Sequence, residues 1–154
     1  MLEDQLIETW QIHSRITRYI LHAVAAEVFE LPVPKKGRSA VQIFAHIHNV
    51  RLLWLQSALS AMPNDVVKLA TDTALARDDI HSALLASEAA IELLLREGLA
   101  SGRIKGFKPH PSAFLGYMIA HESYHHGEIG IALTAAGFPL DRKTAFGIWE
   151  WGVR

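Results

Sequence analysis

Apolar residues recur at steps of three and four positions in four long segments of this 154-residue chain, and this repeat constrains the fold more than any other feature. Such spacing places apolar side chains on one side of an α-helix, where they can be buried together. The predicted helices cover about 2–30, 40–61, 72 or 73 to 98–102, and 113–136. Because no segment alternates as a β-strand does, the pattern predicts an all-α fold, a four-helix bundle in a single domain over residues 1–154.

The connections between the predicted helices differ in length. Prolines and a glycine in 31–38 end the first helix, and the segment 62–71 is longer than a tight helix hairpin needs. Ser39 and Ser112 are the predicted N-caps of the second and fourth helices. The last segment, 141–154, is rich in aromatic residues and is predicted to pack on the bundle or on a partner.

Composition excludes several classes of protein. Half of the residues are hydrophobic, which is enough for a sizeable core, and acidic and basic residues nearly balance. This balance gives no reason to expect nucleic-acid binding. The chain has no cysteine, and therefore no disulfide or thiolate metal site. Without a signal-peptide pattern or an apolar stretch that could span a bilayer, we expect a soluble cytoplasmic protein with no membrane contact.

The string His121-Glu122-Ser123-Tyr124-His125 is an H-E-x-x-H motif inside the fourth predicted helix. Residues four apart lie on the same side of a helix, so the two imidazoles can converge on one metal ion. The nine histidines of the chain make such a pair less specific than it looks, and the alternative is a pair of core-edge histidines without a metal.

A third ligand is expected from the second helix, which carries His46 and His48. These two residues point about 200° apart around the helix, so only one of them can face a shared metal, and periodicity does not decide which. Three histidines would leave at least one coordination position open, as in a catalytic site, where water or a thiol could bind.

A zinc protease is not favoured by the motif. The extended protease motif requires a glycine and a third histidine downstream, but Glu128 and Ile131 occupy these positions. The chain also lacks the strands that would hold a peptide substrate. Peptidase activity is therefore the least favoured of the metal-dependent reactions considered.

The motifs of the second and fourth helices together resemble those of the DinB family of bacterial four-helix-bundle proteins. Ala45-His46-Ile47 followed by Asn49-Val50-Arg51 is similar to the second-helix motif, and the segment 120–129 is similar to the fourth-helix motif. The likeness covers nearly the whole chain. Two positions depart from the family pattern: Tyr124 replaces a frequent histidine, and His126 replaces a frequent arginine.

The resemblance implies several properties that the residues alone do not. It places a metal triad on His46, His121 and His125, with zinc or nickel as the divalent transition metal. It also implies an up-down-down-up bundle, often a homodimer. The family includes thiol-dependent transferases, an isomerase that uses a low-molecular-weight thiol cofactor, and many members of unknown activity. A thiol-dependent transferase acting on a small molecule is therefore the favoured function, followed by a metal-dependent hydrolase and by a non-catalytic stress-response binding protein.

Five further residues are candidates for lining a cavity or for supporting the ligands. They are His13, Glu122, Tyr124, His126 and Glu128. Each has an ordinary alternative, which is a core histidine for His13 and a helix contact or a solvent-exposed charge for Glu122.

Two predicted loops are basic, one with Lys35, Lys36 and Arg38 and the other with Arg103, Lys105 and Lys108. They would form a common basic rim for an anionic thiol only if they lie at the same end of the bundle. Trp149 and Trp151 are candidates for a dimer contact.

Overall fold

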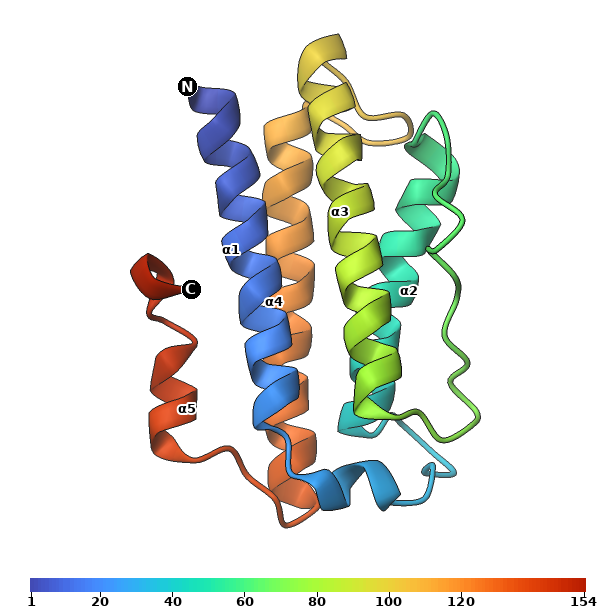
Figure 1. Ribbon diagram of the computed structural model, residues 1–154, viewed down its shortest axis with the longest axis vertical. Helices are drawn as coiled ribbons and strands as arrows, with labels where there is room; N and C mark the ends of the chain where they lie inside the picture. The colour runs from blue at the N-terminus through green and yellow to red at the C-terminus, as the bar shows by residue number, and fades with distance from the viewer.

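Four long helices, arranged side by side, make up most of the computed structural model, which describes residues 1–154 (Figure 1). The long helices are α1 (Leu2–Ala23), α2 (Ala40–Ala58), α3 (Arg77–Ser101) and α4 (Pro111–Ala135), followed by the short α5 (Arg142–Gly147). Two short 3-10 helices cover Ala26–Glu30 and Trp151–Val153. The predicted all-α class and the four-helix bundle are confirmed.

Some predicted helix ends were wrong. The first helix stops at Ala23 rather than near residue 30, because Val24 is extended and a separate 3-10 helix follows. Val28, in this 3-10 helix, is buried against the core like the apolar residues of α1. The apolar repeat of the sequence therefore continues past the end of α1. The second helix is also shorter than predicted and ends at Ala58.

The third and fourth helices begin at other residues than predicted. The third starts only at Arg77, where the Asp79 carboxylate accepts a hydrogen bond from the Ala76 amide. The fourth starts at Pro111, since Nδ1 of His110 accepts from the Ala113 amide and proline is favoured in a first turn. The predicted cap at Ser112 is therefore wrong, whereas Ser39 does cap α2.

The bundle has the up-down-down-up topology that the family resemblance implied. Figure 1 shows α1 and α4 running in one direction and α2 and α3 in the other, so the chain between α2 and α3 must return along the bundle. Side chains of α2 fix this crossover: the Gln42 amide donates to the Thr71 carbonyl, and Asn49 bonds both the amide and the carbonyl of Leu69. The predicted long connection is thus explained by the topology.

The apolar core is divided into two clusters along the bundle axis. On α1, for example, Trp10 belongs to one cluster and Ile16 to the other, and Met118 and Ile129 are divided in the same way on α4. The level between the clusters holds most of the buried polar residues, among them His13, Ser14, Thr17, Arg51, Ser87, Glu122 and His125. All four helices contribute to this polar layer, and it contains or adjoins the candidate site residues.

The C-terminal tail packs beside α1, as Figure 1 shows. The Tyr19 hydroxyl donates to the Thr144 carbonyl, and the Arg154 guanidinium lies 3.8 Å from the centre of the Tyr19 ring. Phe146 and Trp149 on the tail remain largely exposed. No helix of the chain combines the length and the apolar character needed to cross a membrane.

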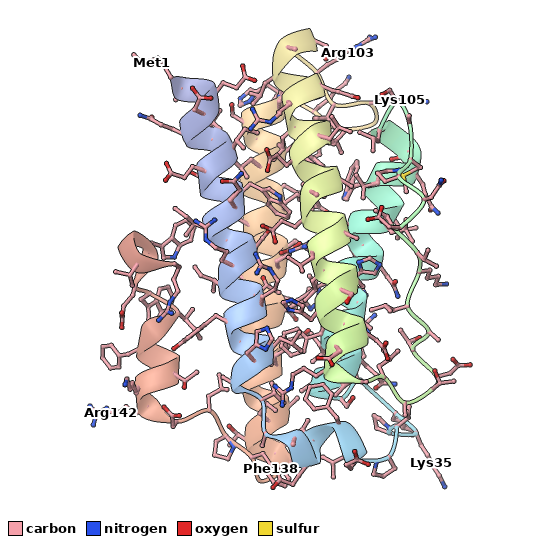
Figure 2. The ribbon with its side chains drawn as sticks, viewed as in Figure 1. Met1, Lys35, Arg103, Lys105, Phe138 and Arg142 are labelled. Carbon is pink, nitrogen blue, oxygen red and sulfur yellow. The ribbon has the colours of Figure 1, made fainter.

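The two basic loops lie at opposite ends of the bundle (Figure 2). Lys35 is at one end, while Arg103 and Lys105 are at the other. A common basic rim is therefore excluded by the topology, and only the loop with Lys35, Lys36 and Arg38 lies next to the start of α2.

Candidate metal centre

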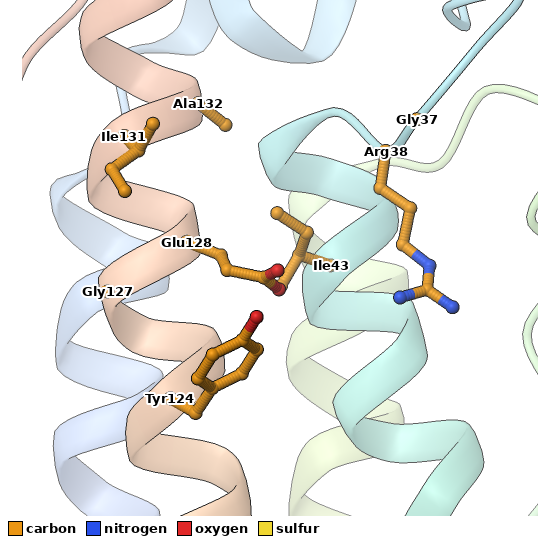
Figure 3. A pocket seen from close by; sticks show the side chains of 8 residues that line it. All are labelled: Gly37, Arg38, Ile43, Tyr124, Gly127, Glu128, Ile131 and Ala132. Carbon is orange, nitrogen blue, oxygen red and sulfur yellow. The ribbon is translucent and has the colours of Figure 1, made fainter.

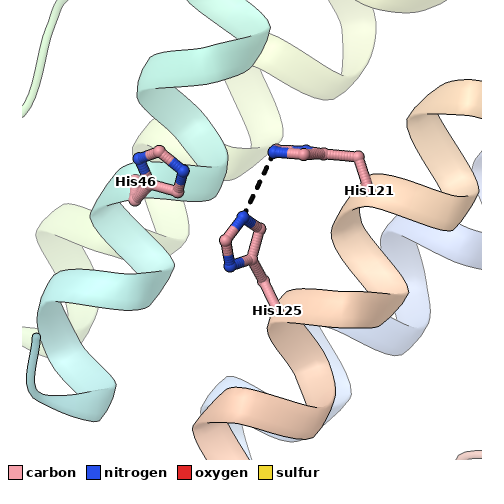
Figure 4. Close-up of side chains that lie close together, drawn as sticks. All are labelled: His46, His121 and His125. Carbon is pink, nitrogen blue, oxygen red and sulfur yellow. Dashed lines mark hydrogen bonds between the residues drawn. The ribbon is translucent and has the colours of Figure 1, made fainter.

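Three histidines from two neighbouring helices converge at one place, shown in Figure 4. His46 comes from α2, while His121 and His125 lie one turn apart on α4. Nε2 of His121 and Nε2 of His125 are 3.1 Å apart, and one ring nitrogen of each histidine lies within 4.8 Å of the others. Such a group could hold a metal ion.

The structure separates the two histidines of α2 that periodicity could not rank. His46 is partly exposed and faces α4, with its ring centre 4.7 Å from that of His125. His48 is fully buried on another side of α2, where its Nε2 is 2.8 Å from the Val67 carbonyl oxygen of the crossover. His48 therefore holds the crossover and lies outside the cluster.

The hydrogen bond of His125 prepares its ring for a metal. Nδ1 of His125 lies 2.6 Å from a carboxylate oxygen of Glu128, one turn further along α4. Because an ionised carboxylate only accepts, Nδ1 carries the proton, and the lone pair of the neutral ring lies on Nε2, the atom that faces His121. Carboxylates commonly orient metal-binding histidines in this way.

The other two imidazoles are kept neutral by their surroundings. Burial, followed by the charge of Arg38 and the neighbouring histidines, lowers the pKa of His46 to about 4. Burial also lowers the pKa of His121, and Nδ1 of this ring is buried without a partner. Imidazoles are suitable donors for a divalent transition metal, which binds a ring nitrogen that carries no proton. The residues present therefore fit such a metal.

Two cavities adjoin the three histidines. The larger, of about 910 Å³, lies between α2, α4 and the loop before α2 (Figure 3). Its lining residues are Gly37, Arg38, Ile43, Tyr124, Gly127, Glu128, Ile131 and Ala132. A smaller polar cleft of about 380 Å³ has His46 in its wall and shares Gly37 and Arg38 with the first. The cluster thus lies beside enough space for a small-molecule substrate.

Tyr124 and Glu128 are the polar side chains that α4 presents to the larger cavity. Figure 3 shows both pointing from α4 toward α2, where Ile43 faces them. Tyr124 is largely exposed, and its ring meets that of His125 edge-on. The structure therefore places both residues next to the candidate ligands.

Glu122 points away from the cluster and is fully buried. Its carboxylate makes a bidentate ion pair with Arg51, at 2.7 and 2.8 Å, and also lies 2.9 Å from Nε2 of His13. Burial would raise the pKa of Glu122, but the Arg51 guanidinium outweighs this effect and holds the pKa well below its usual range. Glu122 is thus at a helix contact rather than in solvent, and it is not available as the general base of a protease.

His13 and His126 belong to the same buried network. Their rings stack with centres 5.3 Å apart, and Nε2 of His126 lies 2.8 Å from the Thr17 hydroxyl. Burial, and to a smaller degree His13, lowers the pKa of His126 to about 3. The structure does not bring His13, Glu122 or His126 to the three-histidine cluster.

Sequence reasoning missed the role of Arg51. This side chain is almost fully buried, lies 4.8 Å from the centre of the Trp10 ring, and also donates to the Leu84 carbonyl and the Ser87 hydroxyl. The sequence did contain an indication of this role. Arg51 is the neighbour of Leu52, which lies on the apolar stripe of α2, and a charge buried at such a place requires a partner. Tyr117, whose ring stacks on His121, was also missed.

A bundle of four helices with three histidines on two of them defines a class of helical proteins with a candidate metal centre. The DinB family model matches residues 1–141, and the chain belongs to the DinB family. No curated protein and no solved structure gives a significant match. The match ends at the start of the tail, so α5 and the last 3-10 helix lie outside it.

Proposed function

We propose that the chain is a metal-dependent transferase that joins a low-molecular-weight thiol to an electrophilic small molecule. His46, His121 and His125 would hold one divalent transition metal, zinc or nickel. The observation that carries this proposal is the convergence of three imidazoles beside a cavity of about 910 Å³. When bound, the metal would supply an open position that favours the deprotonated form of a thiol or water.

The residues around the cluster support binding of an organic substrate. Ile43, Ile131 and Ala132 give the larger cavity an apolar wall, which suits the carbon skeleton of an electrophile. Glu128 orients His125 and also faces this cavity, where its carboxylate can accept a proton or a hydrogen bond. Tyr124 provides the only hydroxyl in the lining.

Arg38 suits an anionic group on the thiol. It lines both cavities, makes no ion pair within the chain, and lies close enough to His46 to lower the pKa of that ring. A carboxylate on a low-molecular-weight thiol would be attracted to this guanidinium while its sulfur lies near the histidines. Arg38 would therefore favour negatively charged thiols over neutral ones.

A metal-dependent hydrolase is the second candidate, because the same open position can bind water. The non-catalytic binding protein is favoured only by the exposed Phe146 and Trp149 of the tail. The cavities beside the histidines favour the enzyme instead. The homodimer and the cytoplasmic location stay predictions.

The decisive experiment combines metal analysis with a thiol screen. The purified chain, loaded with zinc or nickel, should hold about one metal ion per chain, by analogy with three-histidine sites. It should consume a carboxylate-bearing thiol and a model electrophile together, and His46→Ala should remove this activity. His81→Ala is the matched control, because His81 is distant in sequence and pairs only with His22. Hydrolysis of an ester or amide substrate in the absence of any thiol would favour the hydrolase. Absence of bound metal after reconstitution would refute both the transferase and the hydrolase.

A further inference from the structure

A second, separate cavity lies on the far side of α4 from the three histidines. It measures about 320 Å³ and is enclosed by α1, α4 and the C-terminal tail. Its lining residues are His13, Ile16, Ser123, His126, Gly127, Ile148, Trp149 and Trp151. The tail residues among them lie outside the range that the family model matches, so this cavity is a feature that the tail adds to the family bundle.

The cavity is built around one buried and one partly buried imidazole. His13 is 1 % exposed, and the ring of His126 stacks on it. The known hydrogen bonds of both rings use Nε2, and Nδ1 of neither ring has a partner within the protein. The buried side-chain atoms without any partner are Ser14 Oγ, His48 Nδ1 and His121 Nδ1, so Nδ1 of His13 and Nδ1 of His126 each keep some accessible surface, and both residues line the cavity.

The partners of Nε2 determine what each free Nδ1 can do. Glu122 is ionised and can only accept, so Nε2 of His13 donates to it, and Nδ1 of the neutral ring carries a lone pair. Nε2 of His126 is occupied by the Thr17 hydroxyl at 2.8 Å, so Nδ1 is the unpaired nitrogen of this ring too. One acceptor, Nδ1 of His13, and a second unpaired ring nitrogen, Nδ1 of His126, consequently belong to the pair of rings that lines this wall of the cavity.

The remaining walls are apolar and aromatic. Ile16 and Ile148 are accompanied by the indole rings of Trp149 and Trp151. A volume near the lower end of the usual range for ligand pockets, about 300 to 1,000 Å³, suits a molecule of one or two rings. The lone pair on Nδ1 of His13 favours an occupant that can donate a hydrogen bond.

We propose that this cavity binds a small neutral aromatic molecule that donates an O–H or N–H group to Nδ1 of the His13–His126 pair. The site is distinct from the metal centre, since it faces another side of α4 and shares only Gly127 with the larger cavity. Because Glu122 joins His13 to Arg51, an occupant would contact the buried network rather than the metal ligands.

Phenol and toluene are the probes that test this proposal, because they have nearly the same shape and differ in one hydroxyl. Binding to the full chain is measured by ligand-observed NMR, with and without zinc. Phenol should bind about 2- to 10-fold more tightly than toluene, the ratio that one net hydrogen bond provides, and zinc should not change either affinity. Equal affinities for the two probes, or no binding of either, would overturn the proposal.

Three variants locate the binding. His126→Phe keeps the stacked ring and removes its nitrogens, so the preference for phenol should shrink or disappear. Ser123→Trp, at an exposed position, should fill the cavity and abolish binding of both probes without touching the core. Trp149→Ala should weaken both, whereas Phe146→Ala, another exposed aromatic residue of the tail that does not line the cavity, should not.

The outcome is independent of the proposed transferase activity. Phenol binding that survives Ser123→Trp would place the ligand elsewhere and refute the site. Concentration-dependent dimerisation that Trp149→Ala abolishes, with no competition by phenol, would mean that a second copy of the chain covers this face. Retained thiol transfer in Ser123→Trp would show that loss of this cavity leaves the metal centre intact.

Discussion

Neighbouring residues on α4 occupy two very different environments. His121 and His125 face α2 at the edge of a cavity, with ring nitrogens that face one another and one buried nitrogen without a partner. Glu122 and His126, each one position further along, turn toward α1 and the middle of the bundle, where both carboxylate oxygens of Glu122 are occupied. The first region is incompletely bonded and suited to binding. In the second region the Glu122 carboxylate is paired with Arg51 and His13, an arrangement suited to holding the helices together.

This contrast explains how one motif can contain both functions. A helix turns about 100° per residue, so consecutive residues must face different neighbours. In H-E-x-x-H the histidines therefore share one side, and the glutamate belongs to another. Here the second side is the polar layer between the two apolar clusters, and the glutamate is used for structure.

The largest expected effect comes from breaking the buried network. Glu122→Gln keeps the volume but leaves the Arg51 charge without its counter-ion, and should lower the free energy of unfolding by about 3–5 kcal/mol. Urea denaturation followed by circular dichroism measures this loss. Glu128→Gln is the matched control on the same helix, since a half-exposed pair contributes only about 0–1 kcal/mol. Equal losses in the two variants would contradict the division between the regions.

Removing a ligand should affect the other region. His121→Ala should lower zinc affinity by more than about 100-fold, above the 10- to 100-fold loss typical of residues that only orient ligands. His48→Ala should retain zinc binding and lose stability instead, because His48 is buried against the crossover. Calorimetric titration with zinc measures both. Retained zinc affinity in His121→Ala would remove this residue from the proposed site.

A smaller effect on the same region is expected from Glu128→Gln. The amide cannot hold the proton of His125 Nδ1 as a carboxylate does, so zinc affinity should fall by about 10- to 100-fold while the fold stays intact. Glu97→Gln, in which the altered carboxylate contacts Ser60 far from the histidines, should bind zinc as before. Identical zinc affinities in the two variants would show that Glu128 does not orient the ligand.

The smallest effect per step of the measurement is expected in the acid stability of the metal-free chain, which should change gradually with pH. The pKa of His126 falls from about 6.5 in the unfolded chain to about 3 in the folded chain, so the unfolded state binds more protons between these values. Stability should therefore be complete above about pH 6.5 and decrease as the pH falls toward 3, by at most about 1.4 kcal/mol per pH unit. His126→Phe should reduce this slope. An unchanged slope would mean that His126 is more accessible to water than its burial indicates.

Local periodicity was sufficient for the four helices and for the long connection after the second, whereas the up-down-down-up topology came from the family resemblance. It also identified His121 and His125 as a pair, because their spacing lies within one helix. The choice of His46 over His48 came from the family motif, and the structure places His46 in the cluster. Helix ends were less predictable, since the buried Val28 continues the apolar repeat after α1 has ended.

Contacts between distant helices were not predictable from the pattern of one segment. The partners of Glu122 are 71 and 109 residues away in sequence, so nothing near position 122 indicates an ion pair with Arg51. The stacking of His126 on His13 and the cavity under the tail also involve residues that are far apart in the sequence, and so they were not predicted. Each depends on how α1, α2 and α4 are placed around the bundle axis, which helical spacing does not define.

The Arg51–Glu122 pair has a consequence for the thermodynamics of metal uptake. It joins α2 and α4, the two helices that carry the three histidines, within two turns of His46 and next to His121. The gap between these helices is therefore set before any ion arrives, and uptake needs to order side chains rather than backbone. Amide hydrogen exchange in α2 and α4 should accordingly change little between the apo and zinc-loaded forms. An ion that needs a wider gap would bind more weakly, because it would have to strain the Arg51–Glu122 ion pair.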